Sequence, residues 1–145
     1  MLRRLVLVFS LALCFALPSC QSYTGGLQKS MAGADETAAI SALHAIAVAQ
    51  RTYSITNGGE YGTLQQLTDG GFLDVRYGGS KPVKDYTLTM NVIPKSSGGP
   101  EGSYSCNADP DDKGPAGRHF YVDSTSTAIH VNASQPATAQ DPTAQ

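Results

Sequence analysis

The sequence predicts an α+β domain in which one N-terminal amphipathic helix packs on an antiparallel sheet of three to four strands. Apolar residues recur at steps of three and four between Asp35 and Tyr53, which is the spacing of one helix face. After residue 85, apolar and polar residues alternate in several short runs, which is the spacing of half-buried strands. Because no other stretch has a comparable helical pattern, this helix must cover one side of the core.

The helix predicted over residues 35–53 has signals at both of its ends. Its stripe contains the apolar residues that we expect to face the sheet: Ile40, Leu43, Ile46 and Tyr53. Two acidic residues, at 35 and 36, lie near the positive end of the helix dipole and favour a start there. The sequence Asn57-Gly58-Gly59 favours an end, since glycine readily takes the left-handed conformation of a helix C-terminus. Next along the chain, Leu64 and Leu67 share one side of a short helical turn.

Four short runs predict the strands of the sheet. Each run places its large or apolar residues at every second position, so that these residues face the helix: Tyr86, Leu88, Met90 and Val92; Tyr104, Cys106 and Ala108; Phe120 and Val122; Ile129 and Val131. Loops rich in Gly, Pro, Ser and Asp separate the runs. An antiparallel sheet covered on one face by the helix is the economical arrangement of these elements.

The first twenty residues predict an exported, lipid-anchored protein. A short basic start precedes a largely apolar run of 13 residues from Leu5 to Leu17, and at about 1.5 Å per residue this run is too short for a bilayer core of roughly 30 Å. It has the length of the apolar region of a signal peptide. The sequence Leu17-Pro18-Ser19-Cys20 resembles the lipobox of bacterial lipoproteins, which are cleaved before the cysteine that carries the lipids. The alternative is an ordinary signal peptide with an incidental cysteine.

This resemblance divides the chain into four parts. Residues 1–19 are the expected signal peptide, and residues 20–33 are the lipidated Cys20 with a flexible tether of polar and small residues. Residues 34–131 are the folded domain. Residues 132–145 contain no large apolar side chain that could anchor a core, so we expect this tail to be disordered.

Charge and cysteine content exclude several classes of protein. Loss of residues 1–19 would leave eight basic and twelve acidic residues, and the resulting charge of −4 argues against nucleic-acid binding. With Cys20 lipidated, Cys106 has no cysteine partner, so the domain must be stable without a disulfide.

The domain resembles the globular part of type IV pilin-like proteins, including the major pseudopilin of type II secretion. The similarity runs from Asp35 to about Pro142 and lies in the order and spacing of several short motifs: Glu36-x-x-Ala39-x-x-x-Leu43, Tyr61-x-Thr-Leu64-x-x-Leu67, Gly71-Phe-Leu-Asp74, Tyr104-x-x-x-Ala108-x-Pro110 and Gly117-Arg-x-Phe-Tyr-x-Asp123. The chain lacks the long apolar N-terminal helix that packs pilins into filaments. The resemblance therefore implies a pilin head on a lipid anchor that is not itself a filament subunit.

Two other functions compete with this interpretation. The first is a small hydrolase that uses Cys106 or Ser105, although the sequence offers no nucleophile with an evident base. The second is a calcium-dependent adhesion module, because the major pseudopilin binds calcium in a late loop and this chain has Asp109, Asp111 and Asp112 in a comparable place. An EF-hand is excluded there, because a lysine and a phenylalanine occupy positions that need oxygen ligands.

We expect none of the three histidines to bind zinc, because His44, His119 and His130 share no ligand spacing. The function expected is non-enzymatic: a structural or protein-binding role in the cell envelope, without a cofactor, beside pilus or type II secretion machinery. The partners expected are the membrane, through the lipid, and an envelope protein. Gln21 is not the aspartate associated with inner-membrane retention in lipoproteins, which favours the outer membrane.

Overall fold

The computed structural model describes residues 21–98, 100–111 and 117–144, with side chains from Ser30 onward. The expected signal peptide and Cys20 lie outside the described residues. The chain divides into two compact units, Met1–Ser30 and Met31–Gln145, and the domain architecture below belongs to the second. Among the described residues, no helix is both long and apolar enough to cross a membrane.

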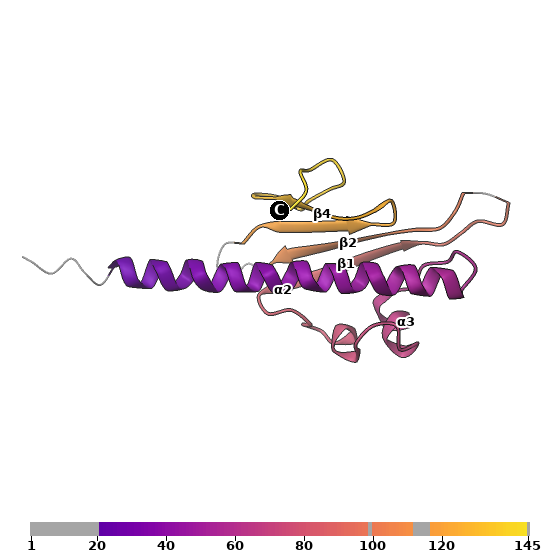
Figure 1. Ribbon diagram of the computed structural model, residues 1–145, viewed down its shortest axis with the longest axis horizontal. Helices are drawn as coiled ribbons and strands as arrows, with labels where there is room; N and C mark the ends of the chain where they lie inside the picture. Colours follow the sequence, from indigo (N-terminus) through magenta and orange to yellow (C-terminus); the bar gives the residue numbers. More distant parts are fainter. Residues whose placement is uncertain (1–20, 99, 112–116, 145) are drawn as a thin grey trace, which may run out of the picture. The chain divides into compact units, whose positions relative to one another are not determined.

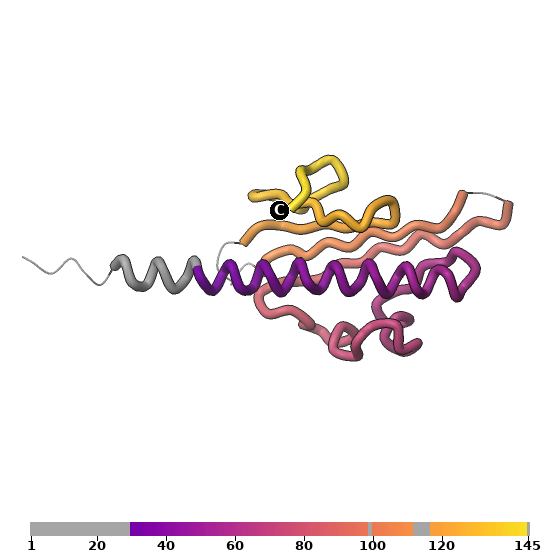
Figure 2. The backbone as a smooth tube through the Cα atoms, in the orientation of Figure 1, coloured from indigo at the N-terminus to yellow at the C-terminus, as the bar shows by residue number. Residues whose placement is uncertain are grey.

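The second unit is a helix packed on a four-stranded antiparallel sheet, which confirms the predicted α+β class (Figure 1). The helices are α2 (Gln21–Thr56), α3 (Leu64–Asp69) and the 3-10 helix η2 (Val75–Gly78). The strands are β1 (Tyr86–Ile93), β2 (Ser103–Pro110), β3 (His119–Asp123) and β4 (Ser126–Asn132). They lie in the sheet in sequence order, and each pairs antiparallel with the next, so the chain runs back and forth in a simple meander (Figure 2).

Helix α2 begins well before the predicted start at Asp35. The flexible tether predicted for residues 20–33 is therefore helical from Gln21 onward. No proline interrupts residues 21–56, and the glycines at 25, 26 and 33 each cost only about 1 kcal/mol of helix stability. The predicted end is closer to the observed one: the helix stops at Thr56, and Gly58 takes the left-handed conformation with φ of 66°.

The core lies between the buried face of α2 and the inner face of the sheet. Leu43 and Ile46 are fully buried, whereas Ile40 and Tyr53 are half-buried and pack against the core. Each strand contributes core residues at the positions that the alternating pattern predicted. The buried ones are Tyr86, Tyr104, Cys106, Ala108, Phe120, Val122 and Ile129. Small residues of the helix, including Ala39 and Ala42, let it approach the sheet closely.

The predicted disordered tail is ordered over residues 132–144. It returns antiparallel to β4, where the Val131 amide donates to the Pro142 carbonyl (2.8 Å) and the Ala144 amide donates to the Ile129 carbonyl (2.7 Å). Ala137 is buried, and its carbonyl accepts a hydrogen bond from the Asn107 side chain (2.9 Å). The prediction of disorder considered only how little apolar surface this segment can bury. In the structure, hydrogen bonds to the sheet hold the segment in place.

Candidate functional site

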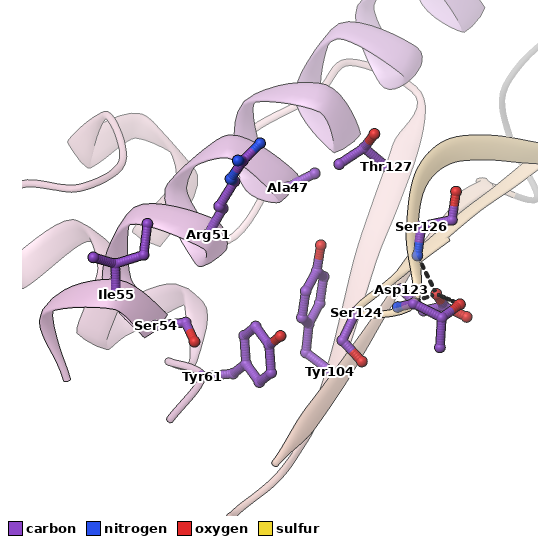
Figure 3. Close-up of a pocket in the computed structure, with 11 residues that line it drawn as sticks. Ala47, Arg51, Ser54, Ile55, Tyr61, Tyr104, Asp123, Ser124, Ser126 and Thr127 are labelled. Atoms are coloured by element: carbon purple, nitrogen blue, oxygen red, sulfur yellow. Dashed lines mark hydrogen bonds between the residues drawn. The ribbon is translucent and has the colours of Figure 1, made fainter. Parts of the chain in front are cut away.

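An open pocket of about 470 Å³ lies between the C-terminal half of α2 and the turn that joins β3 to β4 (Figure 3). Its lining consists of Ala47, Arg51, Ser54 and Ile55 from the helix, Tyr61 and Tyr104 at its base, and Asp123, Ser124, Thr125, Ser126 and Thr127 from the turn. The pocket belongs entirely to the second unit. Its volume falls within the range of small-molecule sites in proteins.

A buried glutamine fixes the loop that brings Tyr61 to this pocket. Gln50 is completely buried, and its side chain donates to the Gly62 carbonyl (2.6 Å) and accepts from the Gly62 amide (2.9 Å). These two bonds satisfy the polar groups of the side chain in the core. They also hold the chain after α2 in one place, next to Tyr104. The rings of Tyr61 and Tyr104 lie 5.1 Å apart and are tilted by 52°.

The opposite wall is a turn organised by one carboxylate. Asp123 Oδ1 accepts from the Thr125 amide (2.8 Å), the Thr125 hydroxyl (2.6 Å) and the Ser126 amide (3.3 Å). Asp123 Oδ2 accepts from the Tyr121 hydroxyl (3.0 Å). Burial by itself would raise the pKa of Asp123, but these hydrogen bonds outweigh it and hold the pKa below its ordinary value. The negative charge of Asp123 is thus used to shape the turn.

Two groups at the pocket have no partner in the part of the chain that the structure describes. Tyr104 is only 6% exposed, yet no described residue hydrogen-bonds to its hydroxyl. The hydroxyl oxygen is not fully enclosed by protein, so it reaches the space of the pocket. Burial, with a smaller contribution from neighbouring groups, raises the pKa of Tyr104 far above its ordinary value, so the hydroxyl remains a donor. Arg51 is exposed on the helix side, and within the described part of the chain it forms no ion pair.

Figure 3 shows how these groups face the pocket. Arg51 and Ala47 lie on the helix side, and Ser126 and Thr127 lie on the side of the turn, with the Tyr104 hydroxyl between the two walls. The lining thus combines one cation, one hydrogen-bonded carboxylate, several hydroxyls and a small apolar area. This set of groups can bind a polar ligand.

The two nucleophiles considered for a hydrolase, Cys106 and Ser105, do not line this pocket. Cys106 is fully buried on the inner face of β2, where burial above all, and Asp109 to a lesser degree, raise the pKa of its thiol to about 12. The thiol donates to the Asn107 carbonyl at a sulfur–oxygen distance of 3.8 Å. Ser105 lies on the opposite, outer face of the same strand. A protonated, enclosed thiol is a core residue and not a reactive one.

The three histidines lie on three elements of the structure. His44 is exposed on α2, and His119 and His130 are half-buried on neighbouring strands. His119 Nδ1 contacts Asp109 Oδ1 (2.7 Å), and His130 Nδ1 contacts the Asp141 carbonyl (2.6 Å). Neither pair lies on the inner face with Cys106.

Two of the three calcium candidates are engaged by other side chains. Asp109 pairs with His119, as above, whereas Asp111 forms an ion pair with Lys81 and accepts from the Thr87 hydroxyl (2.7 Å). Hydrogen bonds from Lys81 and then Thr87 hold the pKa of Asp111 below its ordinary value. Asp112 lies outside the described residues. Among the residues that are described, no group of three or more His, Cys, Asp or Glu side chains could hold a metal ion.

Sequence reasoning missed the pocket itself. It placed Tyr104 correctly on the inner face of a strand, but no sequence pattern links this position to Arg51, Tyr61 and the turn between β3 and β4. The pocket forms only when the helix crosses the end of the sheet. Comparison of the chain with protein-family models, with curated proteins and with solved structures found no match.

Proposed function

We propose that this protein is a lipid-anchored component of the bacterial cell envelope whose pilin-like domain works by binding and not by catalysis. The observation that carries the proposal is the order and packing of the elements: one long helix, a short helical segment, and then an antiparallel meander with the helix on one face. This is the arrangement that the resemblance to type IV pilin-like heads implies. The motifs that carry the resemblance, from Glu36 to Asp123, fall on these elements and on the loops that join them.

A binding role is further supported by the positions of the reactive side chains. Covalent catalysis needs a nucleophile within hydrogen-bond reach of a base. Cys106 is enclosed in the core, and the histidines that could serve it, His119 and His130, lie across the sheet on the outer face. The calcium module gains no support from Asp109 and Asp111, because each already has a partner.

The proposed anchor is the lipid on Cys20, and the proposed site is the outer membrane, with the domain facing the periplasm or the exterior. The mature charge of −4 would repel an anionic membrane surface, so the anchor has to be hydrophobic. The domain would stand beside a pilus or a type II secretion filament and bind one of its envelope proteins. We propose that it does not enter the filament.

The test is where the protein fractionates with and without Cys20. The native protein should sediment with membranes and resist a high-salt wash, because multiple acyl chains give a stable anchor at about 0.8 kcal/mol per buried methylene. A version with a generic cleavable signal joined at Gln21 should be released as a soluble protein outside the cytoplasm. If that version still sediments with membranes after the salt wash, the lipid is not the anchor and the proposal fails.

A further inference from the structure

We propose that the pocket between α2 and the β3–β4 turn binds a hydroxylated carboxylate, which is the chemistry of a uronic acid or another acidic sugar unit. This inference concerns the domain alone and goes beyond the proposed envelope role. It rests on three features of the lining: a cation and a tyrosine hydroxyl that have no partner among the described residues, and a high density of further hydroxyls.

The cation of the pocket and its carboxylate lie on opposite walls (Figure 3). Among the described residues, Asp123 is the only acidic one in the lining, and four hydrogen bonds from Thr125, Ser126 and Tyr121 occupy its carboxylate. Arg51 lines the pocket from the helix side without an ion pair in the described part of the chain. A guanidinium group offers two parallel N–H donors that match a carboxylate.

The Tyr104 hydroxyl marks where a ligand oxygen would lie. Its side chain is more than nine-tenths buried, and the hydroxyl lacks a hydrogen-bond partner among the described residues. The ring is buried, but the hydroxyl reaches the pocket and is open to a partner there. A ligand oxygen could take this place in exchange for water. Because the hydroxyl stays protonated, it would donate to that oxygen.

The remaining side chains favour a ligand that carries hydroxyl groups of its own. Ser54, Tyr61, Ser124, Ser126 and Thr127 all bring hydroxyls to the lining. Each such group both donates and accepts, as the hydroxyls of a sugar do. Ala47 and Ile55 supply the small apolar area that the C–H face of a sugar ring would cover. A volume of about 470 Å³ is ample for a single sugar unit.

The direct test is an NMR titration of the full mature chain, purified in detergent, with glucuronate as the probe. We expect saturable shifts of the backbone amides of Ser124 to Thr127. Glucose, which lacks the carboxylate, and acetate, which lacks the hydroxyls, should each bind about tenfold more weakly or worse. Equal binding of glucose would show that charge is not recognised, and equal binding of acetate or inorganic phosphate would reduce the pocket to a general anion site. Either result, or the absence of saturable shifts, overturns the proposal.

Two substitutions separate binding from folding. Tyr104→Phe keeps the ring in the core and removes only the unpartnered hydroxyl, so the Tm should not change while affinity for glucuronate falls about tenfold. Arg51→Gln should behave in the same way. Arg76→Gln removes an arginine on η2 outside the pocket and should leave affinity unchanged. If Tyr104→Phe lowers the Tm and leaves affinity intact, the hydroxyl is structural and the inference is wrong. None of these results bears on membrane fractionation, so this inference and the lipid anchor can fail separately.

Discussion

At the scale of the residue, two nearby positions on α2 have opposite environments. Ile46 is fully buried under the sheet, whereas Val48, two residues on, is 66% exposed. An aspartate at position 46 would be an unpaired charge in the core, which costs several kcal/mol, a large part of the stability of a small domain.

We therefore predict that Ile46→Asp unfolds the domain or lowers its free energy of unfolding by more than about 3 kcal/mol in chemical denaturation. Val48→Asp places the same charge on the solvent side of the same helix and should change stability by less than about 0.5 kcal/mol. Similar stabilities for the two variants would show that this face of α2 is not in the core.

The acidic side chains after β2 give a second prediction at this scale. Because Asp109 and Asp111 are already paired, millimolar calcium should leave the Tm unchanged. Calcium at 100 times its dissociation constant would instead add about 2.7 kcal/mol of stability if it bound only the folded state. A clear rise in Tm that is lost in the double variant Asp111→Ala with Asp112→Ala would favour the calcium-dependent module.

At the scale of the element, one ion pair joins α2 to the start of β3. Glu36 Oε1 accepts from the Arg118 amide (3.0 Å), and Oε2 accepts from the guanidinium (2.8 and 3.2 Å). Burial alone would raise the pKa of Glu36, but the hydrogen bonds and charge of Arg118 outweigh it and lower the pKa. The carboxylate therefore stabilises the fold above the pKa of the unfolded state, about 4.3, and this contribution is lost as the pH falls through the lower folded value.

Glu36→Gln should accordingly cost about 1 kcal/mol at pH 7, a modest value because the Arg118 side chain is largely exposed. The difference between the variant and the native protein should shrink as the pH falls below 4. Glu101→Gln breaks the ion pair between Glu101 and Lys95. Because the Glu101 side chain is 74% exposed, this change should cost almost nothing. Chemical denaturation of the native protein and of both variants at several pH values measures these differences in stability. A Glu36→Gln cost that does not depend on pH would contradict the assignment.

The C-terminal segment makes a prediction for hydrogen exchange. The amides of Val131 and Ala144 donate into the pairing between β4 and this segment, so both should exchange more slowly than the exposed amides of the loops. Asp141 supports the return by accepting from the Thr138 amide (2.7 Å) and the Asn132 side chain (2.8 Å), and Asp141→Ala should speed the exchange at both sites. If the amides at 131 and 144 exchange as fast as loop amides in the native protein, the prediction of a disordered tail would be supported instead.

The sequence predicted elements best where one residue pattern decides the outcome. Alternation in β1 to β4 identified the buried strand positions, because each strand has one face on the core. The early start of α2 at Gln21 was missed, because residues 21–33 carry glycines and no regular apolar stripe. The ordered tail was missed for a related reason. Its order depends on backbone pairing with β4 and on Asp141, neither of which composition records.

At the scale of the whole molecule, the pocket is the feature that sequence patterns could not predict. Its walls come from α2, from the loop after it and from the β3–β4 turn, so its residues lie up to 80 positions apart. Gln50 illustrates the difficulty: it falls on the apolar stripe of the helix, yet it is a buried polar group whose role is to hold Gly62 and thereby Tyr61. Which polar residue a loop needs becomes visible only when the helix and the loop are in place.

The proposed role of the whole molecule depends on the chemical state of its N-terminus, and the mass of the protein extracted from membranes tests this most directly. We predict a mature chain that begins at Cys20 and is heavier than the polypeptide by the mass of its acyl chains. The Gln21 version should have the unmodified mass of residues 21–145. A membrane-extracted protein that starts elsewhere, or whose Cys20 carries no lipid, would contradict the proposal that this is a binding domain held at the envelope by a lipid.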